Sequence, residues 1–345
     1  MTPDDWIATI ADVAHDWQDP DYQRRGVAVQ ATLEAPNRYT EEGLAFALNQ
    51  RMQQLGPDTL RDWIGGRTAR EARNVGIVCN DAPPQDGLIE AIAALVLGHR
   101  VWVARSEASP AIIAAFFEDL LERTAEESVR VVPRDLLFER ADVLVASGTD
   151  ERIDEIERET DEAGIPPERR WLHRHGPVVA VIDGREDAEA RSGLAEDLLL
   201  HEGIAPRTPS LLWAPAGLDP DTMLDTLAGF REVYPVHPDT DGTLAMPTAF
   251  LASAKQSHAV GPGFLVSKGD LEPQAEGHIR WVEYTDFDEV AAWIDGRKDA
   301  LDFVVARPHV AEQLDVGVPF VAPGDAHRPD LGDDVPGLVA FLANA

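Results

Sequence analysis

The segment NVGIVCNDAPPQDGLIEAIAALVLGHRVWVARSEASP, residues 74–110, carries the clearest secondary-structure pattern of the chain. It begins with a short apolar run, residues 75–79, whose length and β-branched content are typical of a buried strand. A polar turn containing Pro83 and Pro84 follows. Because proline has no N–H to donate to a ladder, this turn is expected to end the strand.

The residues after the turn predict a helix and a second strand. Apolar side chains recur at helical spacing from residue 87 to residue 97, and Gly98 supplies the left-handed conformation that ends many helices. Residues 100–104 form another short, mainly apolar run. Strand, helix and strand within about 30 residues predict a right-handed βαβ unit with parallel strands.

These residues resemble the cofactor-binding domain of the aldehyde dehydrogenase superfamily. Asn80 stands where that family has an Asn that stabilises an oxyanion, and Gly98 stands at the glycine of its GN-x-V turn. Ser106, Glu107 and Pro110 match the end of its KPSE-x-x-P segment. The resemblance implies an α/β fold, with a Rossmann-like cofactor domain and a second α/β domain of the catalytic type. An ordinary βαβ unit of another α/β protein would show the same strands and helix, so this alternative stays open.

Composition places the chain among acidic globular proteins. Its 345 residues, of which 44% are hydrophobic, suffice for one large or two ordinary domains. It has 62 acidic and 30 basic residues, a formal net charge of −32, and lysine only at Lys255, Lys268 and Lys298. Acidity spread over every segment favours adaptation to a salt-rich cytoplasm, as in a halophilic archaeon, over mimicry of nucleic acid. Nucleic-acid binding is excluded by the same charge.

Cysteine usage and the N-terminal residues limit the compartment. The single cysteine, Cys79, excludes a disulfide framework and a thiolate zinc cluster. The first 17 residues have neither the cationic start nor the apolar stretch of a signal peptide, and no run is long enough to span a membrane. A cytoplasmic location is therefore expected.

The domain plan follows from helical spacing and from the resemblance. Residues 1–70 predict helices, one of them capped by Thr40 with acids in its first turn. Positions rich in Pro and Gly near 204–220 and 235–247 are expected at crossings between domains. The predicted order is N-terminal helices with the dinucleotide-binding domain over 1–199, a catalytic-type domain over 200–315, and a segment returning to the first domain over 316–345.

A second candidate for cofactor binding follows the apolar run 141–146. There the sequence reads Ser147-Gly148-Thr149 and continues into a predicted helix. In the aldehyde dehydrogenase superfamily the equivalent turn places a helix N-terminus beside the cofactor pyrophosphate, where N–H groups favour an anion. Gly148 and Thr149 are therefore candidate cofactor residues. A simple strand-to-helix turn is the alternative, since the acids that follow Thr149 would repel phosphate.

The resemblance also assigns roles to the residues after 104. Glu107, beside Ser106, stands where the family holds a ribose hydroxyl. Ala104 and Arg105 replace the family's Lys-Pro. Arg105 would meet a 2′-phosphate and favour NADP, or it is an ordinary solvated arginine. The cofactor implied is NADP or NAD.

Two histidines near the middle of the chain are weak candidates for metal binding. His173 and His175 lie two residues apart, but no third ligand follows at a matching spacing. We expect them to be solvent-facing and expect no metal site.

The residues expected to carry the nucleophile do not contain one. The family has Gln-x-Cys-x-x-Pro before a strand, whereas here the sequence is HEGIAPRTPS, residues 201–210. The thiol position falls on Pro206, or on Ala205 or Arg207 if the alignment slides by one. By resemblance Asn80 remains the oxyanion donor. Cys79, next to it, either substitutes for the lost nucleophile or is a buried core cysteine.

The C-terminal residues narrow the resemblance to one branch. The pattern L-x-x-G-V over 314–318, followed by Gly324 and Gly337-Leu338, resembles the tail of the acyl-CoA reductases, the fatty-acid reductases of the bioluminescence type. This branch reduces an acyl-CoA to an aldehyde with NAD(P)H through a thiolate. The alternative is a catalytically inactive relative that binds nucleotide or partners an active subunit. The resemblance further implies a homo-oligomer and a small-molecule acyl-CoA or aldehyde as substrate.

Overall fold

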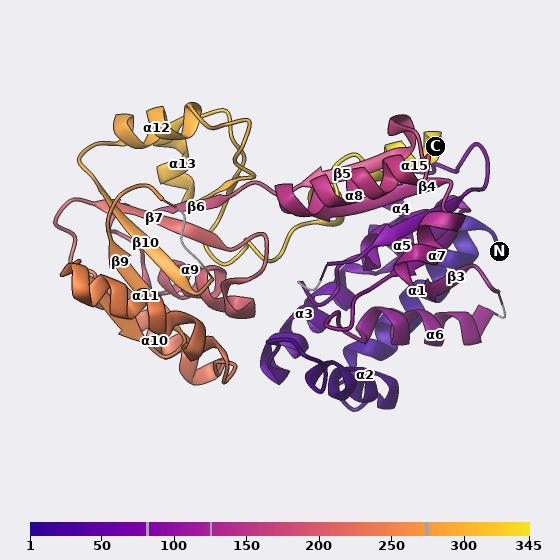
Figure 1. Cartoon of the computed structure of the whole chain (residues 1–345), viewed down its shortest axis with the longest axis horizontal. Helices are drawn as coiled ribbons and strands as arrows, with labels where there is room; N and C mark the ends of the chain where they lie inside the picture. The colour runs from indigo at the N-terminus through magenta and orange to yellow at the C-terminus, as the bar shows by residue number, and fades with distance from the viewer. Residues whose placement is uncertain (81–82, 125, 273–275) are drawn as a thin grey trace. The chain divides into compact units, whose positions relative to one another are not determined.

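The computed structural model describes residues 1–80, 83–124, 126–272 and 276–345. It has the predicted α/β character and divides into two compact units (Figure 1). Unit 1 comprises residues 1–175 and 329–345, and unit 2 comprises residues 176–328. The chain thus leaves unit 1 after His175 and returns at Pro329, whereas the sequence placed these crossings after residues 199 and 315.

Unit 1 is built on a five-stranded parallel sheet with the strand order β3-β2-β1-β4-β5. The predicted βαβ unit is present as β1, α5 (Leu88–Leu97) and β2, with Asn74 opposite Arg100 in the register. Gly98 ends α5 in the left-handed conformation, with φ 99°. The strands of unit 1 are β1 (Asn74–Val78), β2 (Arg100–Ala104), β3 (Val129–Val132), β4 (Val143–Gly148) and β5 (Arg170–Arg174).

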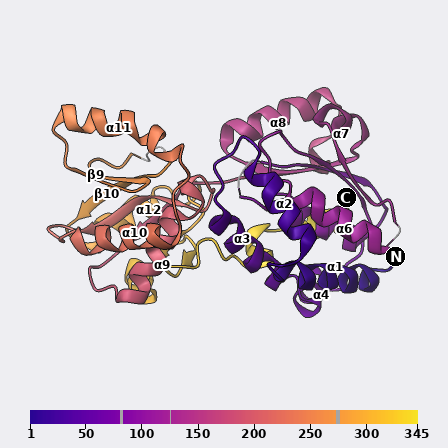
Figure 2. The ribbon, with the colours of Figure 1, turned by 90° about the horizontal axis from the view of Figure 1, so that it is seen from below.

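Helices cover both faces of this sheet, as a parallel sheet requires. In Figure 2, α7 and α8 lie above the sheet and α1 and α4 below it, with α5 packed between α1 and the sheet. Thr40 caps α3 as predicted, since its Oγ1 accepts a hydrogen bond from the Gly43 N–H. Besides α5, the described part of unit 1 contains the helices α1 (Pro3–Gln18), α2 (Gln23–Leu33), α3 (Glu41–Gln54), α4 (Pro57–Ile64), α6 (Ile112–Thr124), α7 (Arg134–Arg140), α8 (Asp150–Glu162), the short η1 (Pro167–Arg169), α14 (Leu331–Asp334) and α15 (Leu338–Asn344).

Alternation along β1 divides its side chains between two hydrophobic clusters. Val75, Ile77 and Cys79 face the cluster formed with α5 and the N-terminal helices, while Val78 faces the cluster under α7 and α8. Gly76 also lies on the α7 side. A β-carbon at Gly76 would come within 2.8 Å of Leu137 on α7, so only glycine permits this close approach.

Unit 2 contains a seven-stranded sheet in the order β12-β11-β6-β7-β10-β9-β8, with β8 antiparallel to β9. Hydrophobic side chains of α9 and α10 pack on one face, and those of α12 and α13 on the other. The strands are β6 (Val178–Val181), β7 (Pro209–Pro215), β8 (His258–Gly261), β9 (Phe264–Lys268), β10 (His278–Tyr284), β11 (Val304–Ala306) and β12 (Phe320–Val321). The helices are α9 (Ala188–Leu199), η2 (Leu200–Gly203), α10 (Asp221–Val233), α11 (Thr240–Ala254), α12 (Phe287–Asp295) and α13 (Pro308–Leu314).

Two expectations about unit 2 are corrected. The segments 204–220 and 235–247 are not crossings, because both lie inside this unit and the second runs into α11. Pro247 lies within α11, which explains why the sequence pattern concealed that helix. Across the described ranges, no helix is both long and apolar enough to cross a membrane.

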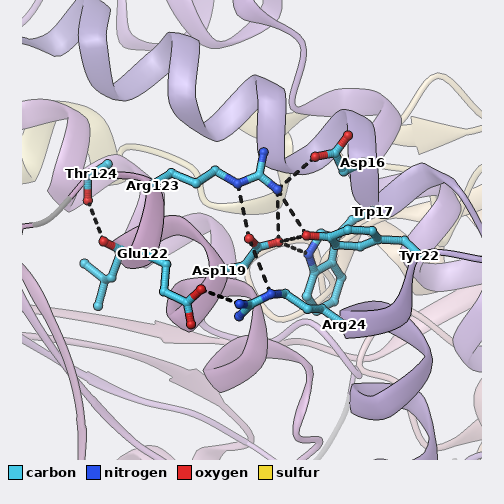
Figure 3. Close-up of polar contacts among 9 residues, drawn as sticks. Asp16, Trp17, Tyr22, Arg24, Asp119, Glu122, Arg123 and Thr124 are labelled. Atoms are coloured by element: carbon cyan, nitrogen blue, oxygen red, sulfur yellow. Dashed lines mark hydrogen bonds and ion pairs between the residues drawn. The ribbon is translucent and has the colours of Figure 1, made fainter.

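A buried carboxylate joins the N-terminal helices to the sheet-bearing part of unit 1 (Figure 3). Asp119 on α6 accepts hydrogen bonds from Trp17 Nε1 at 3.0 Å and from Tyr22 OH at 2.8 Å. Arg123 Nε donates to the same carboxylate at 3.1 Å, and Arg24 Nε lies 3.8 Å away. Burial alone would raise the pKa of Asp119, but the bonds from Tyr22, Trp17 and Arg123 outweigh it and hold that pKa below its ordinary value.

We predict that Asp119→Ala lowers the free energy of unfolding by about 3 kcal/mol, because buried donors lose their acceptor. Glu127→Ala, which removes an exposed carboxylate 2.9 Å from Arg130, is the matched control and should cost less than about 0.5 kcal/mol. Urea denaturation of both variants checks this, and equal effects would contradict it. Because the folded pKa is depressed, the stability difference between wild type and Asp119→Asn should be full above about pH 4 and shrink in stronger acid.

Candidate functional site

Three polar segments follow strands that end at the same edge of the unit 1 sheet. β1 leads to Asn80, β2 to Arg105, and β4 to Thr149. The chain reverses its direction of winding between β1 and β4, which are neighbours in the sheet. Ligands of open α/β sheets bind at such a switch point, outside the carboxyl ends of the strands. The structure therefore brings the cofactor candidates and Asn80 to one edge.

Asn80 is held in place from two sides. Its Nδ2 donates to the Ser147 carbonyl oxygen at 2.7 Å, and its backbone N–H donates to Asp86 Oδ2 at 2.6 Å. An amide nitrogen carries two hydrogens, so one remains for a carbonyl or oxyanion. The side chain is half-buried, which leaves it within reach of a ligand. These contacts suit the role predicted for Asn80.

The turn after β4 forms the start of α8, as the sequence suggested. Thr149 caps the helix, with its Oγ1 accepting from the Arg152 N–H at 3.4 Å. A β-carbon at Gly148 would lie 3.5 Å from Asn80 Oδ1, so this turn and Asn80 are neighbours. The acid that argued against phosphate binding, Asp150, lies 3.4 Å from Arg174 Nη1. This ion pair reduces the repulsion that Asp150 would exert on an anion.

Residues of the loop after β2 differ in whether they bond within the loop or face solvent. Ser106 Oγ accepts from the N–H groups of Ala108 and Ser109 at 3.0 and 3.2 Å, so its hydroxyl stabilises the turn. Arg105 Nη2 donates to the Ser109 carbonyl oxygen at 3.4 Å. Glu107 is exposed, and within the described part of the chain its carboxylate has no recorded hydrogen bond or ion pair. Glu107 is thus the residue of this loop most open to a ribose.

Cys79 does not fit the role of a substitute nucleophile. Its side chain is 4% exposed and belongs to the cluster under α5. A β-carbon built on Gly87 would lie 2.5 Å from its Sγ, so the thiol fills the space that glycine leaves. The thiol is therefore shielded from a substrate by the surrounding core. The structure therefore favours the alternative stated from the sequence, a core cysteine.

In unit 2, the segment where the family has its nucleophile is strained and turned inward. His201 and Glu202 have φ values of 55° and 58°, in the left-handed region that such residues rarely adopt. Buried Glu202 accepts from Arg231 Nη1 at 3.1 Å and from Thr240 Oγ1 at 2.5 Å. These bonds hold the strained backbone in place.

The aligned alternatives for the thiol position also serve the fold. Ala205 is 6% exposed. Arg207 donates from Nε to the Ala326 carbonyl oxygen at 2.5 Å and lies 4.4 Å above the Phe303 ring. Neither these residues nor Pro206 carries a nucleophile.

A buried group that sequence reasoning missed lies beside this segment. His201 packs edge to face on His327, with ring centroids 5.6 Å apart. Burial lowers the pKa of His201 to about 3 and that of His327 to about 4, so both are neutral. Asp197 accepts from the N–H groups of Gly324 and Ala326, and burial raises its pKa to about 8. These buried residues join α9 to the end of unit 2.

The two histidines considered as metal ligands form a ring stack. His173 lies parallel to Trp171 at 5.4 Å and edge-on to His175 at 4.9 Å, and both histidines are half-buried. Among the residues that the structure describes, no three His, Cys, Asp or Glu side chains are placed to hold a metal ion.

Comparison with solved structures identifies the fold as that of aldehyde dehydrogenases. An NAD-dependent benzaldehyde dehydrogenase from Corynebacterium glutamicum matches 96% of this chain and 84% of its own, with a TM-score of 0.70 and 14% identity. An indole-3-acetaldehyde dehydrogenase solved with NAD+ matches 94% of this chain over 77% of its own length, with a TM-score of 0.70 and 13% identity. A succinic semialdehyde dehydrogenase from Streptococcus pyogenes, solved with NADP+, covers 92% and 81%, with a TM-score of 0.66 and 10% identity.

Sequence comparison adds no relative to these. No protein-family model and no curated protein matches the chain. The predicted aldehyde dehydrogenase-like fold is confirmed at the level of structure. The structures named above are aldehyde dehydrogenases and do not show the acyl-CoA reductase branch.

We predict that Cys79 in the folded protein reacts with a thiol-specific disulfide reagent about 10³-fold more slowly than in the unfolded protein, because the thiol is reached only through opening of the core. Absorbance of the released chromophore measures the rate. Ser253→Cys, at an exposed position on α11, is the control and should add one fast-reacting thiol. Rapid labelling of wild type would restore Cys79 as a candidate nucleophile.

Proposed function

We propose that this protein is an NAD(P)-dependent oxidoreductase of the aldehyde dehydrogenase fold that acts on a carbonyl carbon, in an aldehyde or an acyl-CoA thioester. One observation carries the proposal: Asn80, the Gly148 turn and Glu107 lie at one carboxyl edge, around the switch point between β1 and β4. The structural relatives named above include proteins solved with NAD+ and with NADP+.

The residues at this edge fit a dinucleotide. The N-terminus of α8 faces the switch point, with its first acid paired to Arg174, and can take the pyrophosphate. The exposed carboxylate of Glu107 can accept hydrogen bonds from a ribose. Bound there, the dinucleotide would supply or accept a hydride.

At the substrate, Asn80 would act on the carbonyl oxygen. Its side-chain amide is fixed by Ser147 and its backbone N–H by Asp86, so the second amide hydrogen can be aimed without reorganisation at the position where negative charge develops. An acyl-CoA as substrate follows from the C-terminal resemblance alone. The expected homo-oligomer and the adaptation to a salt-rich cytoplasm also stay predictions.

A second candidate function is dinucleotide binding without turnover. It is favoured by the lack of any cysteine other than buried Cys79, which removes the thiolate on which the family's covalent route depends. Titration of NADPH fluorescence in multimolar KCl, followed by assays with acyl-CoA esters and aldehydes, separates the two. Binding with turnover supports the first proposal, binding alone supports the second, and no binding contradicts both.

We predict that Glu107→Ala raises the Kd for NADPH and NADH about 10-fold, through loss of one charge-assisted hydrogen bond. Glu127→Ala is the control, since it removes an exposed carboxylate just before β3, at the amino edge of the same sheet. Fluorescence titration gives both constants. An unchanged Kd for Glu107→Ala would show that the ribose lies elsewhere.

We predict that Arg105→Ala weakens NADPH binding about 10-fold and leaves NADH binding unchanged, if the guanidinium meets the 2′-phosphate. Competition between the two dinucleotides on wild type and variant measures the ratio. Equal losses for both would assign Arg105 to the loop, through its bond to Ser109.

A further inference from the structure

Asp86 joins the two strands that flank the switch point. Its Oδ2 accepts from the Asn80 N–H at 2.6 Å, and its Oδ1 lies 3.5 Å from Ser147 Oγ. Asn80 follows β1 and Ser147 lies in β4, so this carboxyl group lies where both strands end. Residue 86 as a whole is half-buried.

A second acid and an unsatisfied amide accompany Asp86. Glu90, four residues further along and in the first turn of α5, is 7% exposed. Gln85, next to Asp86, is 9% exposed, and its Oε1 has no hydrogen-bond partner among the described residues. A buried acceptor without a partner calls for a donor from outside, a water molecule or a ligand. A hydrogen-bond donor could therefore bind at Gln85, beside the carboxyl groups of Asp86 and Glu90.

Burial favours the protonated form of both carboxyl groups. Burial raises the pKa of Asp86 to about 6, and burial together with Asp86 raises that of Glu90 to about 8. Asp334 on α14 acts in the same direction, while His175 lowers the pKa of Asp86 and Arg51 lowers that of Glu90. Arg51 is already engaged with Asp334 at 2.5 Å. Acids of this kind can donate a proton near neutral pH.

We propose that Asp86 donates the proton to the carbonyl oxygen of an aldehyde that accepts a hydride directly, and that Glu90 reloads Asp86. This rests on the proposed function and names its substrate class. Without a nucleophilic thiol no acyl-enzyme forms, so an aldehyde is reduced to a primary alcohol in one step.

The step balances without another reactant. The hydride of the reduced dinucleotide forms the new C–H bond, and the π electrons of the C=O bond move to oxygen. Asn80 donates a hydrogen bond to that oxygen, which takes the proton of the Asp86 carboxyl group. The Asp86 carboxylate then takes a proton from Glu90, which is recharged from solvent. The dinucleotide is oxidised by two electrons and the aldehyde is reduced by two.

The test compares wild type with Asp86→Asn, which keeps an acceptor for the Asn80 N–H but cannot donate an acidic proton. With NADPH and a panel of aliphatic and aromatic aldehydes in multimolar KCl, we expect kcat to fall at least 100-fold, with the Kd for NADPH within threefold of wild type. Wild-type kcat should fall as pH rises, because Asp86 and Glu90 lose their protons. Glu90→Gln should shift the pH at which this fall occurs. The control Asp58→Asn, at a side chain that is 93% exposed, should change neither constant.

A readout independent of turnover is proton uptake when NADPH binds in weakly buffered solution. The negatively charged NADPH should raise the proton affinity of Asp86, and the uptake should vanish in Asp86→Asn. Turnover or a pH limb that persists in Asp86→Asn would overturn the proposal, as would wild type that binds NADPH and reduces no aldehyde. Loss of NADPH binding in Asp86→Asn alone would make Asp86 a positioning residue for Asn80. Failure of wild type to bind NADPH would instead refute the proposed function.

Discussion

Parallel pairing is the constraint on which unit 1 depends, because each strand must be followed by a crossover that returns the chain to the starting edge. Helices α5 to α8 supply these crossovers, and the order β3-β2-β1-β4-β5 reverses between β1 and β4. Every strand therefore ends at one edge, and the polar residues that stop the ladders collect there. The bonds among Asn80, Ser147 and Asp86 then tie together the two strands that flank the reversal. The strand order therefore determines where the candidate site lies, and the side chains determine what it can bind.

The scarcity of basic residues determines how buried carboxylates are stabilised. With 30 basic residues against 62 acidic ones, most acids have no cation to pair with. Arginines nevertheless lie at Asp119, Glu202 and Asp183, whose side chains are at most 11% exposed. Burying a charge without a partner costs roughly several kcal/mol of folding free energy, whereas an exposed charge is hydrated and screened by salt. Dissolved salt can screen the repulsion among exposed acids, but it cannot reach buried ones. The arginines are therefore placed where screening by salt is weakest.

Features that depend on neighbouring residues were predictable from the sequence, whereas contacts between residues far apart in the chain were not. The β1–α5–β2 unit, the stop at Gly98 and the cap at Thr40 depend on neighbouring residues alone. The sequence left Cys79 open as a substitute nucleophile or a core cysteine, and the structure places it in the same cluster as Val75 and Ile77, in keeping with strand alternation. The contact between Asp86 and Ser147 links residues far apart in the chain, and the left-handed backbone at Glu202 has no sequence signature. A part of the site was therefore visible only once the strands were paired.

The segment before β7 shows why a single substitution would not restore the missing thiol. A cysteine at Ala205 would be buried, and one at Arg207 would remove both the bond to Ala326 and the contact with Phe303. The backbone before them is strained and held by Glu202, so the segment serves the stability of unit 2. The proposed hydride transfer uses Asn80 and Asp86 and no residue of this segment, and for this reason activity is best sought at the carboxyl edge of unit 1.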